Sequence, residues 1–128
     1  MVIRMILVHE MIKWLETDSN QDKKVMLFDG DVSSVIGVVK CNEDFLGDAI
    51  EIQSVNKHKG MIKKDIEVHA QCLSIKDFIS ILKCYDDKAI IRAHSGSLSY
   101  IAQFVDDIYD EEIPNIMGIF SVYHQCCF

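Results

Sequence analysis

The sequence predicts an α+β fold made of two tandem α-β-β-β units that share one core, with two helices and a mostly antiparallel sheet. Two observations support this prediction. Apolar residues recur twice at helical spacing, and each of these stretches is followed by short apolar runs of strand length. The chain has 128 residues, 49% of them hydrophobic, which suits a single compact domain with one core.

The two predicted helices share one pattern, an apolar stripe at positions i, i+3, i+4 and i+7. The stripe consists of Val8, Met11, Ile12 and Leu15 in the first helix and of Ile75, Phe78, Ile79 and Leu82 in the second. Ser74 stands three residues before Asp77, which is typical of a helix N-terminal cap. Asp77 matches Glu10, because both precede the central apolar pair.

Three strands are predicted after each helix. The runs "VMLF" (25–28) and "AII" (89–91) come first, and "IEIQSV" from Ile50 matches "MGIFSV" from Met117. Between them, the alignment pairs Ser33, Val35, Val38 and Val39 with Ser99, Ile101, Phe104 and Val105. We therefore expect repeat units at about residues 5–55 and 72–123 of a single domain, 1–128. Duplication would explain them, because two units can cover the sheet faces that one leaves bare.

Residues 56–71 are expected to form a hairpin that connects the two units, with Gly60 in its turn. Its return strand, residues 66–71, alternates apolar and polar side chains and is expected to be half exposed. Such a strand, together with the apolar tail at 126–128, can pair across a two-fold axis. A homodimer is therefore the expected oligomeric state.

Charge and composition disfavour several classes of function. The net charge of −7 disfavours nucleic-acid binding, because phosphates repel an acidic chain. No apolar run approaches the roughly 20 residues of a membrane span, and the N-terminal stretch lacks a cleavage site, so we expect a cytoplasmic protein. The five cysteines and five histidines lack metal-ligand spacing, so neither a metal nor another cofactor is expected.

The acidic run "DDIYDEE", residues 106–112, is the strongest candidate for a partner-binding site. It surrounds Ile108 and Tyr109, expected to be exposed in a loop, with five carboxylates. Such charges can steer a basic partner while the aromatic side chain anchors it. The predicted partner-binding residues are Asp106, Asp107, Tyr109, Asp110, Glu111 and Glu112.

Two alternative functions rely on other residues. A basic stretch and a polar turn could hold a small anionic ligand such as a nucleotide signal, through Lys57, Lys59, Lys63, Lys64, His94 and Ser95. A small hydrolase would use His94 and Ser95 with Asp29 and Asp31, although polar turns of this kind are more often structural. A non-catalytic binding protein is the preferred interpretation.

Each helix-strand stretch resembles small proteins of phages and other bacterial mobile elements. The resemblance covers each half, through the apolar spacing and an Asp-x-Lys that leads into a strand, at residues 22–24 and 86–88. It implies a context for the binding function. The protein would be a small acidic inhibitor that binds a defence or regulatory protein in the cytosol of a bacterial host.

Overall fold

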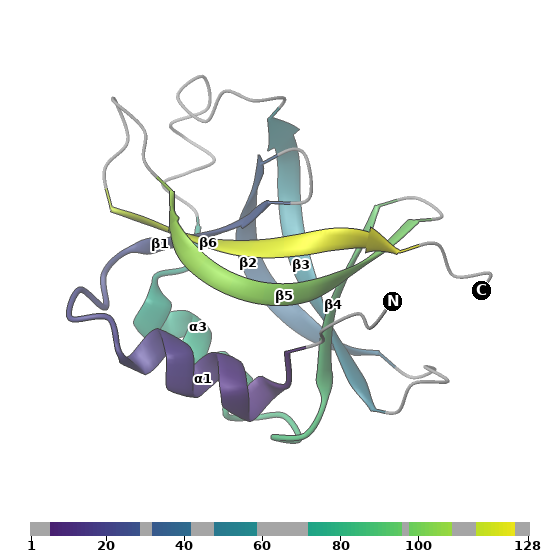
Figure 1. Ribbon diagram of the computed structural model, residues 1–128, viewed down its shortest axis with the longest axis horizontal. Helices are drawn as coiled ribbons and strands as arrows, with labels where there is room; N and C mark the ends of the chain where they lie inside the picture. The colour runs from purple at the N-terminus through teal and green to yellow at the C-terminus, as the bar shows by residue number, and fades with distance from the viewer. Residues whose placement is uncertain are drawn as a thin grey trace.

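Each of the two helices is followed by three strands in the computed structural model, which describes residues 6–28, 32–41, 48–58, 72–95, 98–108 and 115–124 (Figure 1). The order is α1 (Val8–Glu16), β1 (Lys24–Phe28), β2 (Val32–Cys41), β3 (Ala49–His58), α3 (Ile75–Leu82), β4 (Ile90–Ser95), β5 (Leu98–Ile108) and β6 (Ile116–His124). The α+β class predicted from the sequence is therefore confirmed.

The six strands of the described residues form one closed sheet, in which β6 returns to lie beside β1. Within each set of three strands the neighbours are antiparallel, whereas β3 pairs with β4 and β1 pairs with β6 in parallel. The sheet is therefore mixed, and four of its six strand pairs are antiparallel, in agreement with the mostly antiparallel sheet expected from the sequence. Parallel neighbours need a long crossover connection, and the one from β3 to β4 contains α3.

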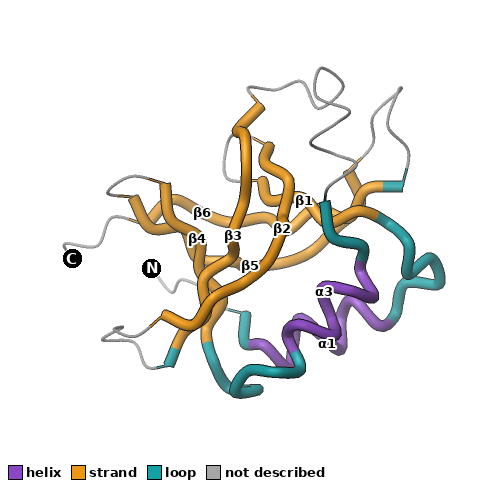
Figure 2. The backbone as a smooth tube through the Cα atoms, turned by 180° about the vertical axis from the view of Figure 1, so that it is seen from behind, coloured by secondary structure: helices purple, strands orange, loops and turns teal. Residues whose placement is uncertain are grey.

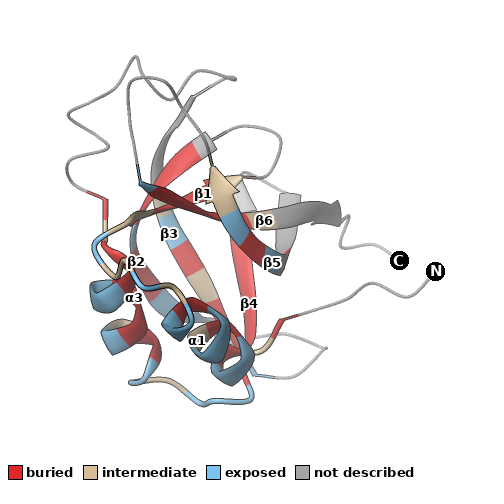
Figure 3. Cartoon of the chain, turned by 60° about the vertical axis from the view of Figure 1, so that its left-hand side comes forward, coloured by how far each residue is buried: buried red, intermediate tan, exposed pale blue. Residues whose placement is uncertain are grey.

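The two helices lie side by side against the sheet (Figures 1 and 2). α1 contacts β5, whereas α3 contacts β1 and β2. Both predicted stripes face inward, and the side chains of α1 that point away from the sheet are exposed (Figure 3). Ile12 is the one stripe residue that is only partly buried.

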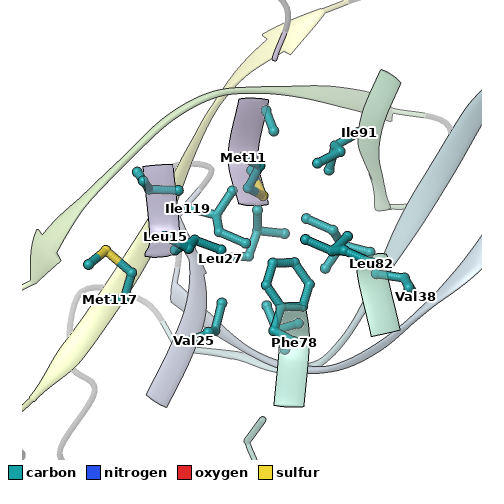
Figure 4. Close-up of a cluster of buried hydrophobic side chains, with 14 of the residues drawn as sticks. Met11, Leu15, Val25, Leu27, Val38, Phe78, Leu82, Ile91, Met117 and Ile119 are labelled. Atoms are coloured by element: carbon teal, nitrogen blue, oxygen red, sulfur yellow. The ribbon is translucent and has the colours of Figure 1, made fainter. Parts of the chain in front are cut away.

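The core lies where the two stripes meet the concave face of the sheet (Figure 4). Phe78 and Leu82 of α3 point toward Leu27 of β1, and Met11 of α1 joins them. Phe78, Leu82 and Met11 each have 0% of their surface exposed. Burial of this apolar surface is the main favourable contribution to folding.

A different capping arrangement begins each helix. At α3 the Ser74 hydroxyl accepts a hydrogen bond from the Asp77 N–H at 3.3 Å, which confirms the predicted cap. At α1 the Glu10 carboxylate accepts one from the Leu7 N–H at 3.0 Å. Both contacts involve the first turn of the helix, where backbone N–H groups lack helical partners.

The residues just before α3 insert between β1 and β2. The Leu73 N–H donates to the Val35 carbonyl at 2.9 Å, and the Leu73 carbonyl accepts from the Val25 N–H at 2.8 Å. The Ile75 N–H then donates to the Lys23 carbonyl at 2.9 Å. The start of the second helix is thus held by the strands of the first half.

The residues just before α1 make the matching contacts with the second half. The Ile6 N–H donates to the Ala102 carbonyl at 3.2 Å, and the Val8 N–H donates to the Ala89 carbonyl at 2.9 Å. Each helix therefore begins on strands of the other half, so the two halves depend on each other for their backbone hydrogen bonds.

β2 and β5 are bulged at matching places. The register of β2 on β3 shifts between Val35 and Gly37, and that of β5 on β6 shifts between Ala102 and Phe104. Val35 therefore matches Ala102, not Ile101 as in the alignment made from the sequence. That alignment is wrong by one residue, because apolar spacing does not reveal the extra residue of a bulge.

The connector between the halves starts later than predicted. Residues 56–58, assigned to the hairpin from the sequence, continue β3 to His58, where Val32 of β2 is still its partner. Most of the predicted hairpin, including the expected edge strand at 66–71, lies outside the described residues, as does the tail at 126–128. The homodimer thus stays a prediction.

Truncation of the central ring should be far more costly than truncation of an exposed one. We expect Phe78→Ala to lower the free energy of unfolding by about 3–5 kcal/mol, because it leaves a cavity between the helices and β1. Phe104→Ala is the matched control, because Phe104 is 38% exposed and mainly loses its stacking on Phe120, at a centroid distance of 4.8 Å. Urea denaturation of both variants measures the difference, and equal losses would contradict the position of the core.

Candidate functional site

Two of the six predicted partner-binding residues lie in the described part of the chain. Asp106 and Asp107 belong to the end of β5, whereas Tyr109 and residues 110–112 lie outside the described residues. The sequence placed Asp106 and Asp107 in a loop, but both are paired with β6. The acidic run therefore begins on a strand that is paired with β6.

Ile108 is not the exposed loop residue that the sequence suggested. It is the last residue of β5, it is half-buried, and it packs against the core. Its side chain covers Gly118 of β6 so closely that a Cβ there would lie 2.6 Å from the Ile108 Cδ1 atom. A partner would therefore find Ile108 already packed within the protein.

Lys23, just before β1, forms ion pairs with two carboxylates. Its Nζ atom lies 2.7 Å from Asp18 Oδ2 and 2.7 Å from Asp107 Oδ1. The side chains of Lys23 and Asp18 are only 15% and 14% exposed, whereas that of Asp107 is 36% exposed. This triad ties the loop after α1 to the end of β5, and it occupies one of the two predicted acidic residues.

The triad shifts the pKa of two of its members. The pKa of Lys23 is raised above its usual value of 10.5, because its ammonium donates to Asp107 and to Asp18. Burial by itself would raise the pKa of Asp18, but hydrogen bonds from Lys23 and from the Asn20 N–H more than offset it and lower this pKa below 3.8. The charged forms of both groups are therefore stabilised by folding.

The polar segment after α1 is an ordered turn that positions Lys23. The Gln21 side-chain amide donates to the Leu15 and Asp18 carbonyls at 3.1 and 2.7 Å, which satisfies acceptors at the end of the helix. The Asp18 carboxylate also accepts from the Asn20 N–H at 2.8 Å. These contacts hold Asp18 beside β1.

Trp14 of α1 lies between two open depressions of the surface. One, of about 400 Å³, is lined by Trp14, Thr17, Asp18, Ser19, Lys23, Val105, Asp106, Asp107 and Met117. The other, of about 570 Å³, is lined by His9, Glu10, Lys13, Trp14 and Thr17. Trp14 is 37% exposed, so part of its side chain is accessible to a ligand in these depressions.

Trp14, Asp18 and Lys23 were not identified by the sequence reasoning. One signal was present for Trp14, because it stands outside the apolar stripe of its own helix and so had to face away from the core. No comparable signal identified Lys23, because its two partners come from a nearby turn and from a strand 84 residues away in the chain.

The residues of the alternative functions are only partly described. Lys57 lies in β3, and His94 and Ser95 lie in β4, in strands and not in the turn suggested by the sequence. Lys59, Lys63 and Lys64 lie outside the described residues, as do Asp29 and Asp31 of the hydrolase alternative. Anion binding and hydrolysis therefore both stay predictions.

The thiol of Cys72 is buried beside β1. Its Sγ atom donates a hydrogen bond to the Val25 carbonyl. Burial raises the pKa of this thiol to about 11. The neutral thiol therefore predominates at neutral pH, which makes Cys72 a poor nucleophile.

In the described part of the chain, no group of three or more histidine, cysteine, aspartate or glutamate side chains is arranged to hold a metal ion. None of the described helices is long and apolar enough to cross a membrane. Comparison with protein-family models, with curated proteins and with solved structures found no match to this chain.

Removal of the central charge of the triad should destabilise the protein in a pH-dependent way. We expect Lys23→Met to lower the free energy of unfolding near neutral pH by about 1.5 kcal/mol, because two carboxylates lose a shared donor. Lys83→Met is the matched control. This substitution removes the 3.9 Å contact between Lys83 Nζ and Glu16 Oε2, and both of these side chains are more than half exposed. It should lower the free energy of unfolding by less than about 0.5 kcal/mol.

The sign of the pH dependence follows from the two pKa shifts. Since the pKa of Asp18 is lowered on folding, this carboxylate stabilises the folded state above pH 3.8, and its contribution to the free energy of unfolding is lost as the pH falls through the pKa of the folded state. Since the pKa of Lys23 is raised on folding, this ammonium stabilises the folded state below pH 10.5, and its contribution is lost as the pH rises through the pKa of the folded state. The difference in free energy of unfolding between wild type and Lys23→Met, measured by urea denaturation, should therefore shrink at both low and high pH. A difference that stays constant with pH would contradict the ion pairing.

The two cysteines with described burial should differ in reactivity. We expect iodoacetamide at pH 8 to alkylate Cys84, which is exposed, and to spare Cys72, which is buried with a raised pKa. Peptide mass spectrometry distinguishes the two sites, and denaturation in urea should make both react. Equal rates in the folded protein would contradict the position of Cys72.

Proposed function

We propose that this chain is a non-catalytic binding protein that docks on a basic protein through the surface formed by Trp14, Asp106 and Asp107, here called the α1–β5 surface. The observation that carries the proposal is the position of Trp14. The only tryptophan of the chain lies partly exposed beside the acidic end of β5. Tryptophan is enriched among the residues that dominate binding energy at protein interfaces.

The charge of the surface supports a basic partner. The 400 Å³ depression is lined by three carboxylates and one ammonium, and the chain as a whole has a net charge of −7. Acidic residues that continue the run, from Asp110 to Glu112, follow Ile108 closely in the sequence. A negative field of this kind accelerates association with a positively charged protein and disfavours acidic ones.

The nature of the partner follows from the resemblance of the helix-strand stretches to proteins of phages and mobile elements. We propose that the partner is a defence or regulatory protein of a bacterial host, which the chain inhibits in the host cytosol. Blocking a protein requires contact area and charge complementarity, and it requires no reacting group on the inhibitor. The α1–β5 surface offers a partly exposed aromatic side chain and a carboxylate for this purpose.

We also propose that the chain arose by duplication of one α-β-β-β unit. The supporting observations are the matching hydrogen bonds before α1 and α3, the matching bulges in β2 and β5, and the two parallel pairs, in which each half contributes one strand in a similar register. In each parallel pair, the first residues of the two strands are opposite each other, Lys24 with Ile116 and Ala49 with Ile90.

The binding function is tested by mixing the tagged protein with a bacterial lysate and recording a native mass spectrum of what is recovered. We expect a stoichiometric complex whose affinity falls by about 2 kcal/mol, roughly 30-fold in Kd, in Trp14→Ala. Ile36→Ala, at an apolar residue of β2 that is 40% exposed, is the matched control and should bind like the wild type.

A double substitution, Tyr109→Ala with Asp110→Ala, tests the part of the acidic run beyond Ile108 in the same assay. We expect this double variant to bind the partner more weakly as well. A partner that binds wild type, Trp14→Ala and the double variant equally well would refute this binding surface. Thermal melting of each variant confirms that a loss of binding is not a loss of folding.

A further inference from the structure

We infer that the α1–β5 surface recognises an arginine side chain of its partner, with the guanidinium stacked on Trp14 and paired with the Asp106 carboxylate. The inference rests on the proposed function and names the chemical group that this surface selects. It starts from the juxtaposition of an indole on a helix and a carboxylate on a strand, which line the same open depression.

The carboxylates of the depression are not equivalent. Asp18 and Asp107 share Lys23, at 2.7 Å each, so their charges are already compensated within the protein. Asp106 is exposed, and among the described residues it has no ion pair. The negative charge left for a ligand is therefore centred on Asp106.

The Asp106 carboxylate also has a fixed direction. Its Oδ1 atom accepts a hydrogen bond from the Asp107 N–H at 2.8 Å, and its own backbone is held by the pairing of β5 with β6. An acceptor that is already oriented loses less side-chain freedom on binding. Asp106 can therefore present an oriented carboxylate edge to a donor.

An arginine fits these two groups better than a lysine does. A guanidinium is planar, so it can stack on the indole of Trp14, and its fork of N–H groups can bind a carboxylate through two hydrogen bonds. A lysine ammonium is compact and strongly hydrated, and it gains less from a flat, open surface. The depression is open to solvent over much of its extent, which favours a flat group over one that needs an enclosing pocket.

The experiment uses Trp14 as its own reporter, because it is the only tryptophan of the chain. The full-length protein is titrated with acetyl-Gly-Arg-Gly-Arg-Gly-amide and with the corresponding lysine peptide, at low ionic strength, while tryptophan emission is recorded. We expect the arginine peptide to change the emission at concentrations about threefold lower than the lysine peptide.

Two substitutions that remove the same charge separate a site from a general field. Asp106→Asn should weaken binding of the arginine peptide by about tenfold. Asp86→Asn should leave it unchanged, because Asp86 is also exposed and also accepts a backbone N–H, from Lys88 at 2.9 Å, but does not line the depression.

Each other outcome overturns the inference. Equal affinity for the two peptides, or equal losses in Asp106→Asn and Asp86→Asn, would mean that an acidic surface attracts any cation. No change of emission with either peptide would mean that Trp14 does not contact the cation. In both cases the proposed function is still supported if Trp14→Ala weakens binding of the protein captured from the lysate. The proposed function itself is refuted if Trp14→Ala binds that protein as tightly as the wild type.

Discussion

The parallel pairing of β1 with β6 is the contact on which both the fold and the site depend. It joins the first strand to the last and closes the sheet, with Lys24 opposite Ile116. Since Ile116 is in turn opposite Ile108, the end of β5 is brought two strands away from the start of β1. Lys23 and Asp107, the neighbours of these residues, can therefore form an ion pair although they are 84 residues apart in the chain.

The two halves have the same order of one helix and three strands, but their surfaces differ. At the offset that relates the matching hydrogen bonds, Trp14 corresponds to Ile81, Asp18 to Tyr85 and Asp106 to Val39. Ile81 packs against the core, and the Tyr85 hydroxyl donates to the Val38 carbonyl at 3.0 Å. The matching place on α3 and β2 is thus made of apolar and aromatic residues, and only the place on α1 and β5 combines an aromatic side chain with carboxylates.

The α1–β5 surface is formed by rigid elements, which suits a binding function. Trp14 stands on a helix anchored by Met11 and Leu15, both fully buried, and Asp106 stands on a strand paired along its length. Side chains on ordered helices and strands bind without the cost of ordering the backbone, so more of the contact energy contributes to affinity. The ion-pair triad holds the two elements together and leaves Asp106 available.

The sequence by itself determined the elements of this protein. Apolar spacing is a local property, so it identified both helices, their buried faces, the Ser74 cap and most of each strand except β4, of which it found only the start. It also drew attention to Asp106 and Asp107. Their position on a strand was missed, because the apolar spacing that marks a strand breaks off where the run of charged residues begins.

Only the tertiary structure decided how those elements meet. The closing parallel pairs, the exchange of helix starts between the halves and the one-residue bulges depend on contacts between distant segments, and no local pattern encodes a partner strand. The same holds for the site, since Trp14 and Asp106 lie 92 positions apart in the sequence and share a depression only because the sheet closes. Local spacing specifies which face of an element is buried, whereas the free energy of the whole chain specifies what that element is buried against.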